Sequence, residues 1–275
     1  MQEATFSWHT ADGLYIHARI WEAEQPKAVI CLAHGLGEHI GRYEHFARWF
    51  TNRGYSLIGY DRRGHGRSAG KKGHSPGVSA LVDEVAHLII EAEARYQGLP
   101  VFLYGHSQGG AIALSYFLRR HPQLAGVVAS APWLRLSFEP PAALITLGKM
   151  VRHIYPGFQQ SNKLDTAMLS RDPEVVEDYE SDPLVHNRIT AGIAISMMEE
   201  GEWLLQQKTP VPCPLLVLHG TRDKITSAKA SEAFVGQLSG DAAFEALDGL
   251  YHEIHNEPEW EAVLSRVAQW MNSRI

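Results

Sequence analysis

One stretch, Gly105-His106-Ser107-Gln108-Gly109, constrains the fold of this chain more than any other. It follows an apolar run at 101–104 that predicts a strand, and it precedes a stretch at 111–118 that predicts a helix. A serine between two glycines at such a junction indicates a sharp turn with a strained backbone and an exposed hydroxyl, because a Cβ at either glycine would keep strand and helix apart. The alternative is a glycine-rich turn that carries a solvated serine.

Strand-like and helix-like segments alternate through the first half of the chain. The continuous apolar run at 28–33 is typical of a strand buried on both faces, and Ser79 is a suitable N-cap for a helix. The expected strands lie at 6–9, 14–21, 28–33, 56–60, 101–104 and 126–130, and the expected helices lie at 43–53, 81–89 and 111–118. This order predicts an α/β fold with a mostly parallel sheet flanked by helices.

The alternation stops at residues 132–182, where prolines and large apolar residues are frequent. It resumes with a long helical pattern at 189–207 and a strand at 215–219, and further elements follow to the end of the chain. We therefore expect a core made of residues 1–131 and 183–275. Residues 132–182 are expected to form an inserted cap, or lid.

Composition excludes several classes of protein. A net charge of −6 gives no electrostatic basis for nucleic-acid binding. Histidine spacing matches no metal motif, and Cys31 and Cys213 are expected to be free thiols in or beside apolar strands. We find neither a signal-peptide pattern nor an apolar run near the ~18 residues of a membrane span, so a cytoplasmic location is expected. No cofactor is predicted, and the oligomeric state is not indicated.

A serine nucleophile needs a base, and the base needs an orienting carboxylate. Asp223 and His252 each follow a predicted strand, and their order after Ser107 is the order that the strand–G-x-S-x-G–helix motif requires. Asp248 competes for the role of acid, but it lies only four residues before His252. His255 competes for the role of base, but the last helix begins near it. His219 is interpreted as a strand-end histidine satisfied by its neighbours.

The tetrahedral oxyanion of acyl transfer requires backbone N–H donors that are already in place. The residue after the nucleophile, Gln108, supplies one donor, and Leu36 in the loop at 34–39 is the candidate for the second. The alternative for that loop is a glycine-rich turn without a catalytic part. The basic loop at 61–68 is interpreted as a structural turn in which backbone and arginine donors hold Asp61.

These segments together resemble the monoacylglycerol lipase and lysophospholipase branch of the α/β-hydrolases. The matching segments, which occur in the family's order, are 34–39 with 41–43, 61–68, 105–110, 181–184, 219–223 and 251–252. The resemblance implies an α/β-hydrolase fold with a lid at residues 132–182. It also implies that Ser107 is the nucleophile, Asp223 the acid and His252 the base, with Leu36 and Gln108 as the oxyanion hole. The same resemblance gives Glu38, His39 and Arg42 a supporting place behind that hole.

The expected function is therefore hydrolysis of a small lipid-like carboxylic ester, most of all a monoacylglycerol, through an acyl-enzyme on Ser107. The alternatives are a lysophospholipase, a broad short-chain carboxylesterase or thioesterase, and a non-catalytic ligand receptor on the same fold. Apolar side chains of the cap are expected to contact the substrate, namely Trp133, Leu144, Leu147 and Val151.

The cap also contains an apolar stripe with helical spacing. Leu144, Leu147, Val151 and Ile154 share one face of a predicted helix, and basic residues lie on other faces. Such a stripe can make transient contact with a membrane or micelle. The alternative is a helix that packs its stripe onto the core.

Overall fold

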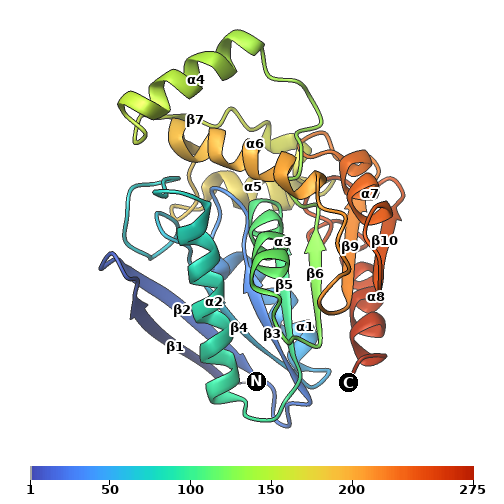
Figure 1. The fold of residues 1–275 in the computed structure, drawn as a ribbon. Helices are drawn as coiled ribbons and strands as arrows, with labels where there is room; N and C mark the ends of the chain where they lie inside the picture. The colour runs from blue at the N-terminus through green and yellow to red at the C-terminus, as the bar shows by residue number, and fades with distance from the viewer. Residues whose placement is uncertain (1) are drawn as a thin grey trace.

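A central sheet of eight strands, ordered β1-β2-β4-β3-β5-β6-β9-β10, organises the computed structural model, which describes residues 2–275 (Figure 1). β1 pairs antiparallel with β2, and β2 pairs antiparallel with β4; the remaining neighbours are parallel. The strands are β1 (Gln2–His9), β2 (Tyr15–Glu22), β3 (Ala28–Ala33), β4 (Tyr55–Tyr60), β5 (Val101–His106), β6 (Gly126–Ser130), β9 (Leu215–Gly220) and β10 (Ala242–Leu247). The predicted α/β fold with a mostly parallel sheet is confirmed, and the first two strands form an antiparallel pair.

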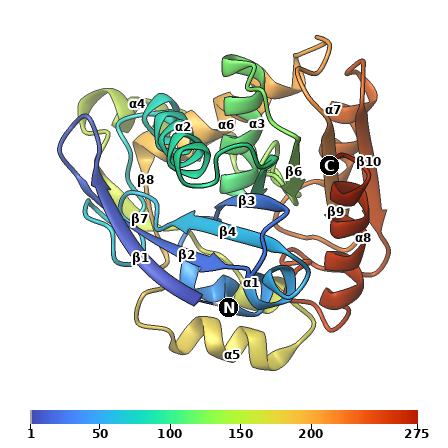
Figure 2. The same cartoon turned by 90° about the horizontal axis from the view of Figure 1, so that it is seen from below.

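Helices cover both faces of the sheet (Figure 2). On one face lie α2 (Val78–Arg95), α3 (Gln108–Arg120) and α7 (Ala228–Gly236), and on the other lie α1 (Glu44–Thr51), preceded by the 3₁₀ turn η1 (Ile40–Tyr43), and α8 (Trp260–Asn272). Every residue of β3, β4, β5, β6 and β9 is buried. This explains their continuous apolar runs, because a strand covered on both faces has no solvent side.

The chain between β6 and β9 lies beyond the carboxyl ends of the parallel strands (Figure 1). It comprises α4 (Ala142–Ile154), β7 (Gln159–Ser161), η2 (Thr166–Met168), α5 (Pro173–Ser181), β8 (Arg188–Thr190) and α6 (Ala191–Leu205). β7 and β8 form a small antiparallel sheet, and α6 contacts both α3 and α4. The cap boundary at residue 182 stays a prediction. β8 lies after that boundary, in the part of the chain that was assigned to the core, but it pairs with β7 in the cap.

Two helices begin differently from expectation in ways that have a local cause. α2 begins one residue before Ser79, and its N-cap is Gly77, which offers no side-chain bond; the predicted N-cap was therefore wrong. The helix expected from residue 189 begins at Ala191, because Ile189 and Thr190 belong to β8. Cys31 and Cys213 are free thiols, as predicted. Among residues 2–275, no helix has both the length and the apolar character needed to cross a membrane.

Candidate active site

Three loops at the carboxyl ends of parallel strands bring Ser107, Asp223 and His252 together. Ser107 follows β5, Asp223 lies three residues beyond β9, and His252 lies five residues beyond β10. The Oγ of Ser107 is 2.9 Å from Nε2 of His252, and Nδ1 of the same ring is 2.7 Å from Oδ2 of Asp223. The structure thus joins the predicted nucleophile, base and acid in one chain of hydrogen bonds.

The turn at Ser107 has the strained geometry that its neighbours predicted. Ser107 adopts φ 53° and ψ −117°, which is rare for a residue with a side chain. A Cβ on Gly109 would lie 2.2 Å from the carbonyl oxygen of Ala33, and one on Gly105 would lie 2.5 Å from the carbonyl oxygen of Gly109. Both positions therefore require glycine for α3 to lie this close to β3 and β5, and the strained turn presents the Ser107 hydroxyl to His252.

The Asp223 carboxylate is held by an unusually complete set of donors. Its Oδ1 accepts from the backbone N–H groups of Ile225 and Thr226, at 2.7 and 3.0 Å, and its Oδ2 accepts from the Thr226 hydroxyl at 2.9 Å. Burial alone would raise the pKa of Asp223, but the nearby His252 and the hydrogen bonds from His219 and His252 outweigh it and hold this pKa well below its usual range. Asp223 is therefore a stable anion beside the imidazole.

His252 is the basic member of a cluster of buried histidines. Burial alone would lower its pKa, but the charge and hydrogen bond of Asp223, aided by Glu253 and Glu38, raise this pKa above the ordinary 6.5. Burial lowers the pKa of His106 well below that value and lowers the pKa of His255 to about 3. The rings of His106 and His255 both lie within 5 Å of another ring of the cluster, yet both stay neutral near pH 7.

The competing residues occupy other places. The side chain of Asp248 is bonded to the hydroxyl of Thr221 at 3.1 Å, outside the chain of hydrogen bonds. His255 lies behind His106 and stacks on Tyr43, with ring centroids 4.8 Å apart. His219 contacts Ser231 through Nδ1 and Asp223 through Nε2, each at 2.9 Å. His219 is thus satisfied by its neighbours, and one of those neighbours is the predicted acid.

The loop after β3 lies beside Ser107. A Cβ on Gly35 would lie 3.3 Å from the Ser107 Cβ, so the loop and the nucleophile are in close contact. Among residues 2–275, the N–H groups of Leu36 and Gln108 donate to no protein acceptor. These are the two donors that the sequence predicted for an oxyanion.

Arg62 is a buried arginine that the sequence placed only in a structural turn. It connects the two segments that carry these N–H donors. Arg62 donates to the Gly35 carbonyl at 2.5 Å and to Oε1 of Gln108 at 2.8 Å. Asp61 accepts from the backbone N–H groups of Ile40 and Arg67, both at 2.8 Å, and from no arginine side chain among the described residues. The turn is structural, as expected, but its Arg62 also holds the loop at 34–39, the candidate oxyanion loop, against α3.

A cavity of about 730 Å³ extends from Ser107 and His252 into the cap. All four predicted substrate-contacting residues line it: Trp133, Leu144, Leu147 and Val151. Leu36, Met198 and Ile195 add to an apolar lining, while Lys163 and Lys224 supply cationic groups. The site therefore combines a serine hydroxyl that lines the cavity with a space suited to an apolar chain. Within residues 2–275, no cluster of three or more histidine, cysteine or acidic side chains is arranged to hold a metal.

Comparison with known proteins agrees with this geometry. The family model described as "Serine aminopeptidase, S33" matches residues 24–259. The chain belongs to this hydrolase family. A monoacylglycerol lipase from Mycolicibacterium smegmatis is 35% identical over 281 residues, covering 100% of both chains. An abhydrolase domain-containing protein from Dictyostelium discoideum is 34% identical over 97% of this chain, which spans only 28% of that protein.

A solved structure is similar over the same length. The crystal structure of a monoacylglycerol lipase from Paleococcus ferrophilus superposes with a TM-score of 0.83 at 33% identity, with 100% of each chain covered. The predicted resemblance to the monoacylglycerol lipase branch of the α/β-hydrolases is confirmed. These relatives also support the predicted enzyme class, a carboxylic ester hydrolase.

Proposed function

We propose that this enzyme hydrolyses monoacylglycerols through an acyl-enzyme formed on Ser107. The observation that carries the proposal is the bonded sequence Ser107–His252–Asp223 at the floor of an apolar cavity. A cavity of about 730 Å³ lies within the roughly 300–1,000 Å³ range of small-ligand sites, and its apolar lining fits one acyl chain. The similarity to monoacylglycerol lipases supports the same substrate class.

The geometry accounts for each step. Nε2 of His252 accepts the Ser107 proton as Oγ attacks the ester carbonyl, and the N–H groups of Leu36 and Gln108 stabilise the oxyanion. The imidazolium then protonates the departing alcohol. Water, deprotonated by the same imidazole, attacks the acyl-enzyme and releases the fatty acid. Asp223 holds Nδ1 protonated and offsets the positive charge of the ring throughout.

The cavity favours an ester over a peptide amine terminus, although the family description names aminopeptidases. Peptide N-termini carry a cation and need a free carboxylate partner. Three carboxylates line the cavity in the described chain: Glu38 and Glu253 are paired with Arg42, and Asp165 accepts the backbone N–H of Ala167 as the N-cap of η2. Side-by-side kcat/KM values for 2-monooleoylglycerol and for amino-acid p-nitroanilides test this choice. A higher value for the anilides would contradict it.

A lysophospholipase is the second candidate, because Lys163 and Lys224 line the same cavity and can pair with a phosphate. The assay for monoacylglycerol should therefore include lysophosphatidylcholine of the same acyl chain. If Lys163→Ala together with Lys224→Ala lowers activity on lysophosphatidylcholine alone, the lysines serve a phospholipid headgroup. If turnover of the phospholipid is absent in the unmodified enzyme, the second candidate is excluded.

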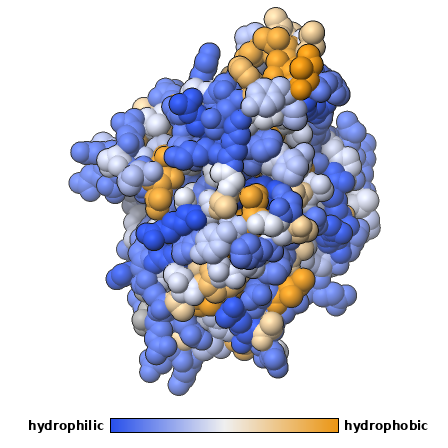
Figure 3. Space-filling model, turned by 90° about the vertical axis from the view of Figure 1, so that its left-hand side faces the viewer, coloured by the Kyte–Doolittle hydropathy of each residue, from blue (hydrophilic) through white to orange (hydrophobic). Residues whose placement is uncertain are grey.

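We also propose that α4 contacts the lipid aggregate from which substrate enters. None of its residues is buried, and Leu147, Met150 and Ile154 have exposed fractions of 55%, 58% and 83%. An apolar patch stands at the top of the molecule, where α4 lies (Figure 3). Leu144, Leu147 and Val151 line the apolar cavity, so we assign the stripe to contact with the entering substrate and not to packing against the core. A cytoplasmic location stays a prediction.

A further inference from the structure

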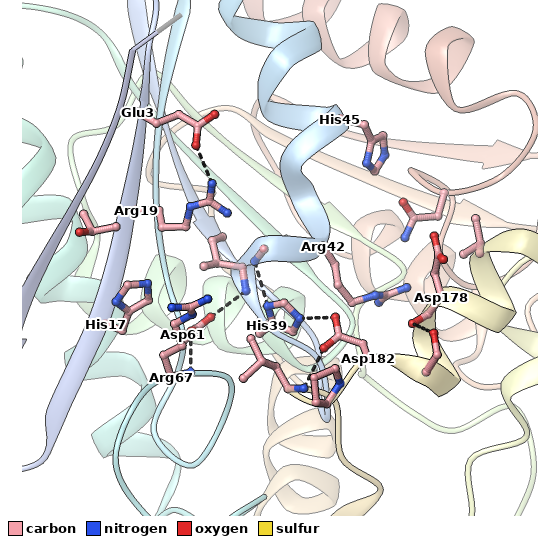
Figure 4. Close-up of a pocket in the computed structure, with 18 of the residues that line it drawn as sticks. Glu3, His17, Arg19, His39, Arg42, His45, Asp61, Arg67, Asp178 and Asp182 are labelled. Carbon is pink, nitrogen blue, oxygen red and sulfur yellow. Dashed lines mark hydrogen bonds and ion pairs between the residues drawn. The ribbon is translucent and has the colours of Figure 1, made fainter.

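A second, polar groove is lined by His39 and Arg42, which follow the residues of the same loop that line the apolar cavity, Gly35, Leu36 and Glu38 (Figure 4 shows the groove). It encloses about 1120 Å³ between β1 and β2, η1, and α5 of the cap. His39 and Arg42 lie at its inner wall, facing Asp178 and Asp182 from the α5 side (Figure 4). Nε2 of His39 is 2.8 Å from the Asp182 carboxylate, so the loop after β3 is tied to the cap here.

Arg42 connects three parts of the site that are distant in sequence. Its guanidinium donates to Oε2 of Glu38 at 2.9 Å and to both carboxylate oxygens of Glu253 at 2.7 Å each. Glu38 belongs to the oxyanion loop, and Glu253 directly follows His252. The ring of Tyr179, on α5, covers the guanidinium with its centroid 4.7 Å from Cζ. The bidentate pair with Glu253 fixes direction as well as distance.

The two carboxylates extend this connection to the reacting groups. Oε1 of Glu38 accepts the backbone N–H of Gly35 at 2.5 Å and the hydroxyl of Tyr43 at 2.9 Å. The Gly35 N–H lies one peptide before the proposed donor, the Leu36 N–H, so the Glu38 bond anchors the start of this loop, while Arg62 holds the Gly35–Leu36 peptide itself through the Gly35 carbonyl. Glu253 also accepts from the side-chain amide of Asn256 at 2.7 Å. A shift of Arg42 would therefore reach both the oxyanion loop and the backbone that carries His252.

Burial makes this arrangement sensitive to the guanidinium. The side chains of Glu38 and Glu253 are each 3% exposed, and that of Arg42 is 9% exposed. Burial alone would raise the pKa of Glu253, but the charge and hydrogen bonds of Arg42 outweigh it and hold this pKa well below its usual range. Burial, with the charge of Glu253, raises the pKa of Glu38 against the opposing charge of Arg42, so removal of Arg42 would leave two buried acidic groups without a cation.

We propose that Arg42 is a positioning residue for the hydrolytic reaction: its fork sets the separation between the oxyanion loop, through Glu38, and the loop of His252, through Glu253. The inference rests on the proposed function of Ser107 and His252. It assigns Glu253, which nothing in the sequence motifs singled out, to the same device. Because misplacement by about 1 Å can lower a rate ~100-fold, the effect belongs in kcat rather than in substrate binding.

The test compares Arg42→Lys, Arg42→Ala and Glu253→Gln with the unmodified enzyme. An aliquot of each sample is first titrated with a fluorophosphonate to its endpoint, so that the rates of the untreated remainder can be expressed per Ser107 that accepts the label. We then measure kcat and KM on p-nitrophenyl butyrate, and the Kd of a boronic acid that forms a tetrahedral adduct with Ser107. Arg135→Lys is the matched control, because Arg135 makes a bidentate pair with Glu202 at 2.9 and 2.8 Å on the exposed surface.

We expect kcat per labelled site to fall about 10- to 100-fold in Arg42→Lys and further in Arg42→Ala, with KM within about threefold. The boronic acid should lose affinity by the same factor as kcat/KM, and Arg135→Lys should match the unmodified enzyme. A merely structural Arg42 would lower the labelled fraction and the melting temperature but leave kcat per labelled site unchanged. That result, or a kcat per labelled site in Arg42→Lys equal to that of the unmodified enzyme, would overturn the inference.

Two further outcomes keep this test separate from the proposed function. If Arg42→Ala does not fold, the isosteric Glu253→Gln decides: it retains the volume, removes the charge and the second acceptor of the bidentate pair, and should lower kcat per labelled site while Asn256→Ala, which removes only the other partner of Glu253, should not. If the unmodified enzyme hydrolyses esters without labelling at Ser107, the proposed function fails, and the inference about Arg42 fails with it. Labelling at Ser107 with unaltered kinetics in Arg42→Lys contradicts the positioning role alone.

Discussion

The floor and the roof of the apolar cavity are built on opposite principles. At the floor, Ser107 is 8% exposed and His252 3% exposed, and each is fixed by hydrogen bonds and by strained or glycine-dependent backbone. At the roof, α4 has no buried residue and presents Leu147 and Ile154 to solvent. The contrast teaches that the reacting groups depend on precise position, whereas the roof supplies apolar surface. Substitutions in the roof should therefore change the free energy of unfolding little.

The largest expected effect separates the two candidate acids at the floor. Asp223→Asn should lower kcat by about 10⁴, because the amide favours the wrong tautomer of His252, whereas Asp248→Asn should change kcat less than about threefold. Steady-state kinetics on p-nitrophenyl butyrate, with thermal melting of both variants, measure this. A severe loss of kcat in Asp248→Asn together with a mild loss in Asp223→Asn would show that Asp223 is not the acid.

The next effect concerns pH and again belongs to the floor. Only neutral His252 accepts the Ser107 proton, and Asp223 raises the pKa of His252 above 6.5. The value of kcat/KM should therefore rise with pH through a midpoint above about 6.5 and fall roughly tenfold per unit on the acid side. A profile that is flat between pH 5 and 9, measured where acylation limits the rate, is incompatible with a histidine base.

A matched pair of apolar changes compares the roof with the core. Leu147→Ser plus Val151→Ser in α4 should lower activity on aggregated monooleoylglycerol about tenfold and spare butyrate esters and the melting temperature, because neither residue is buried. Leu88→Ala in α2, where Leu88 is fully buried, should instead lower the free energy of unfolding by about 2–5 kcal/mol. Equal thermal destabilisation by the two variants would show that the α4 stripe is core.

The smallest effect is expected from Ile154→Ser, at the most exposed end of the stripe. With 83% of Ile154 exposed, this change should leave kcat on butyrate esters unaltered and weaken binding to phosphatidylcholine vesicles about two- to fivefold. Vesicle co-sedimentation measures the binding, and Ile90→Ser, which is exposed by 60% on α2 of the core, is the control. Equal weakening by both would mean that vesicle binding is not specific to the roof.

The floor could be predicted from sequence because its chemistry imposes local patterns. A strained serine needs flanking glycines, and buried parallel strands need continuous apolar runs, so Ser107, Asp223 and His252 could be located by order alone. Arg62 and Glu253 could not be recognised in this way. The Arg62–Gly35 contact spans 27 residues of sequence and the Arg42–Glu253 pair spans 211, and such long-range contacts leave no local periodicity.

The roof was less predictable for a related reason. The stripe of α4 has the spacing of a helix face, but spacing does not say what that face contacts. Similarly, β8 is three residues long and exists through its pairing with β7, so its last two residues, Ile189 and Thr190, were predicted as part of the following helix. Ser79 failed as an N-cap because the chain enters α2 through Gly77, whose backbone adopts φ 173°. Tertiary packing decided each of these points.

The central claim, an acyl-enzyme on Ser107, is tested most directly by covalent labelling. The enzyme is treated with increasing amounts of a fluorophosphonate, and each sample is divided between an ester hydrolysis assay and peptide mass spectrometry. We predict one adduct per chain, on the peptide that contains Ser107, with activity lost in proportion to its occupancy. Full occupancy of Ser107 with retained esterase activity, or complete inhibition with the adduct on another residue, would contradict the account.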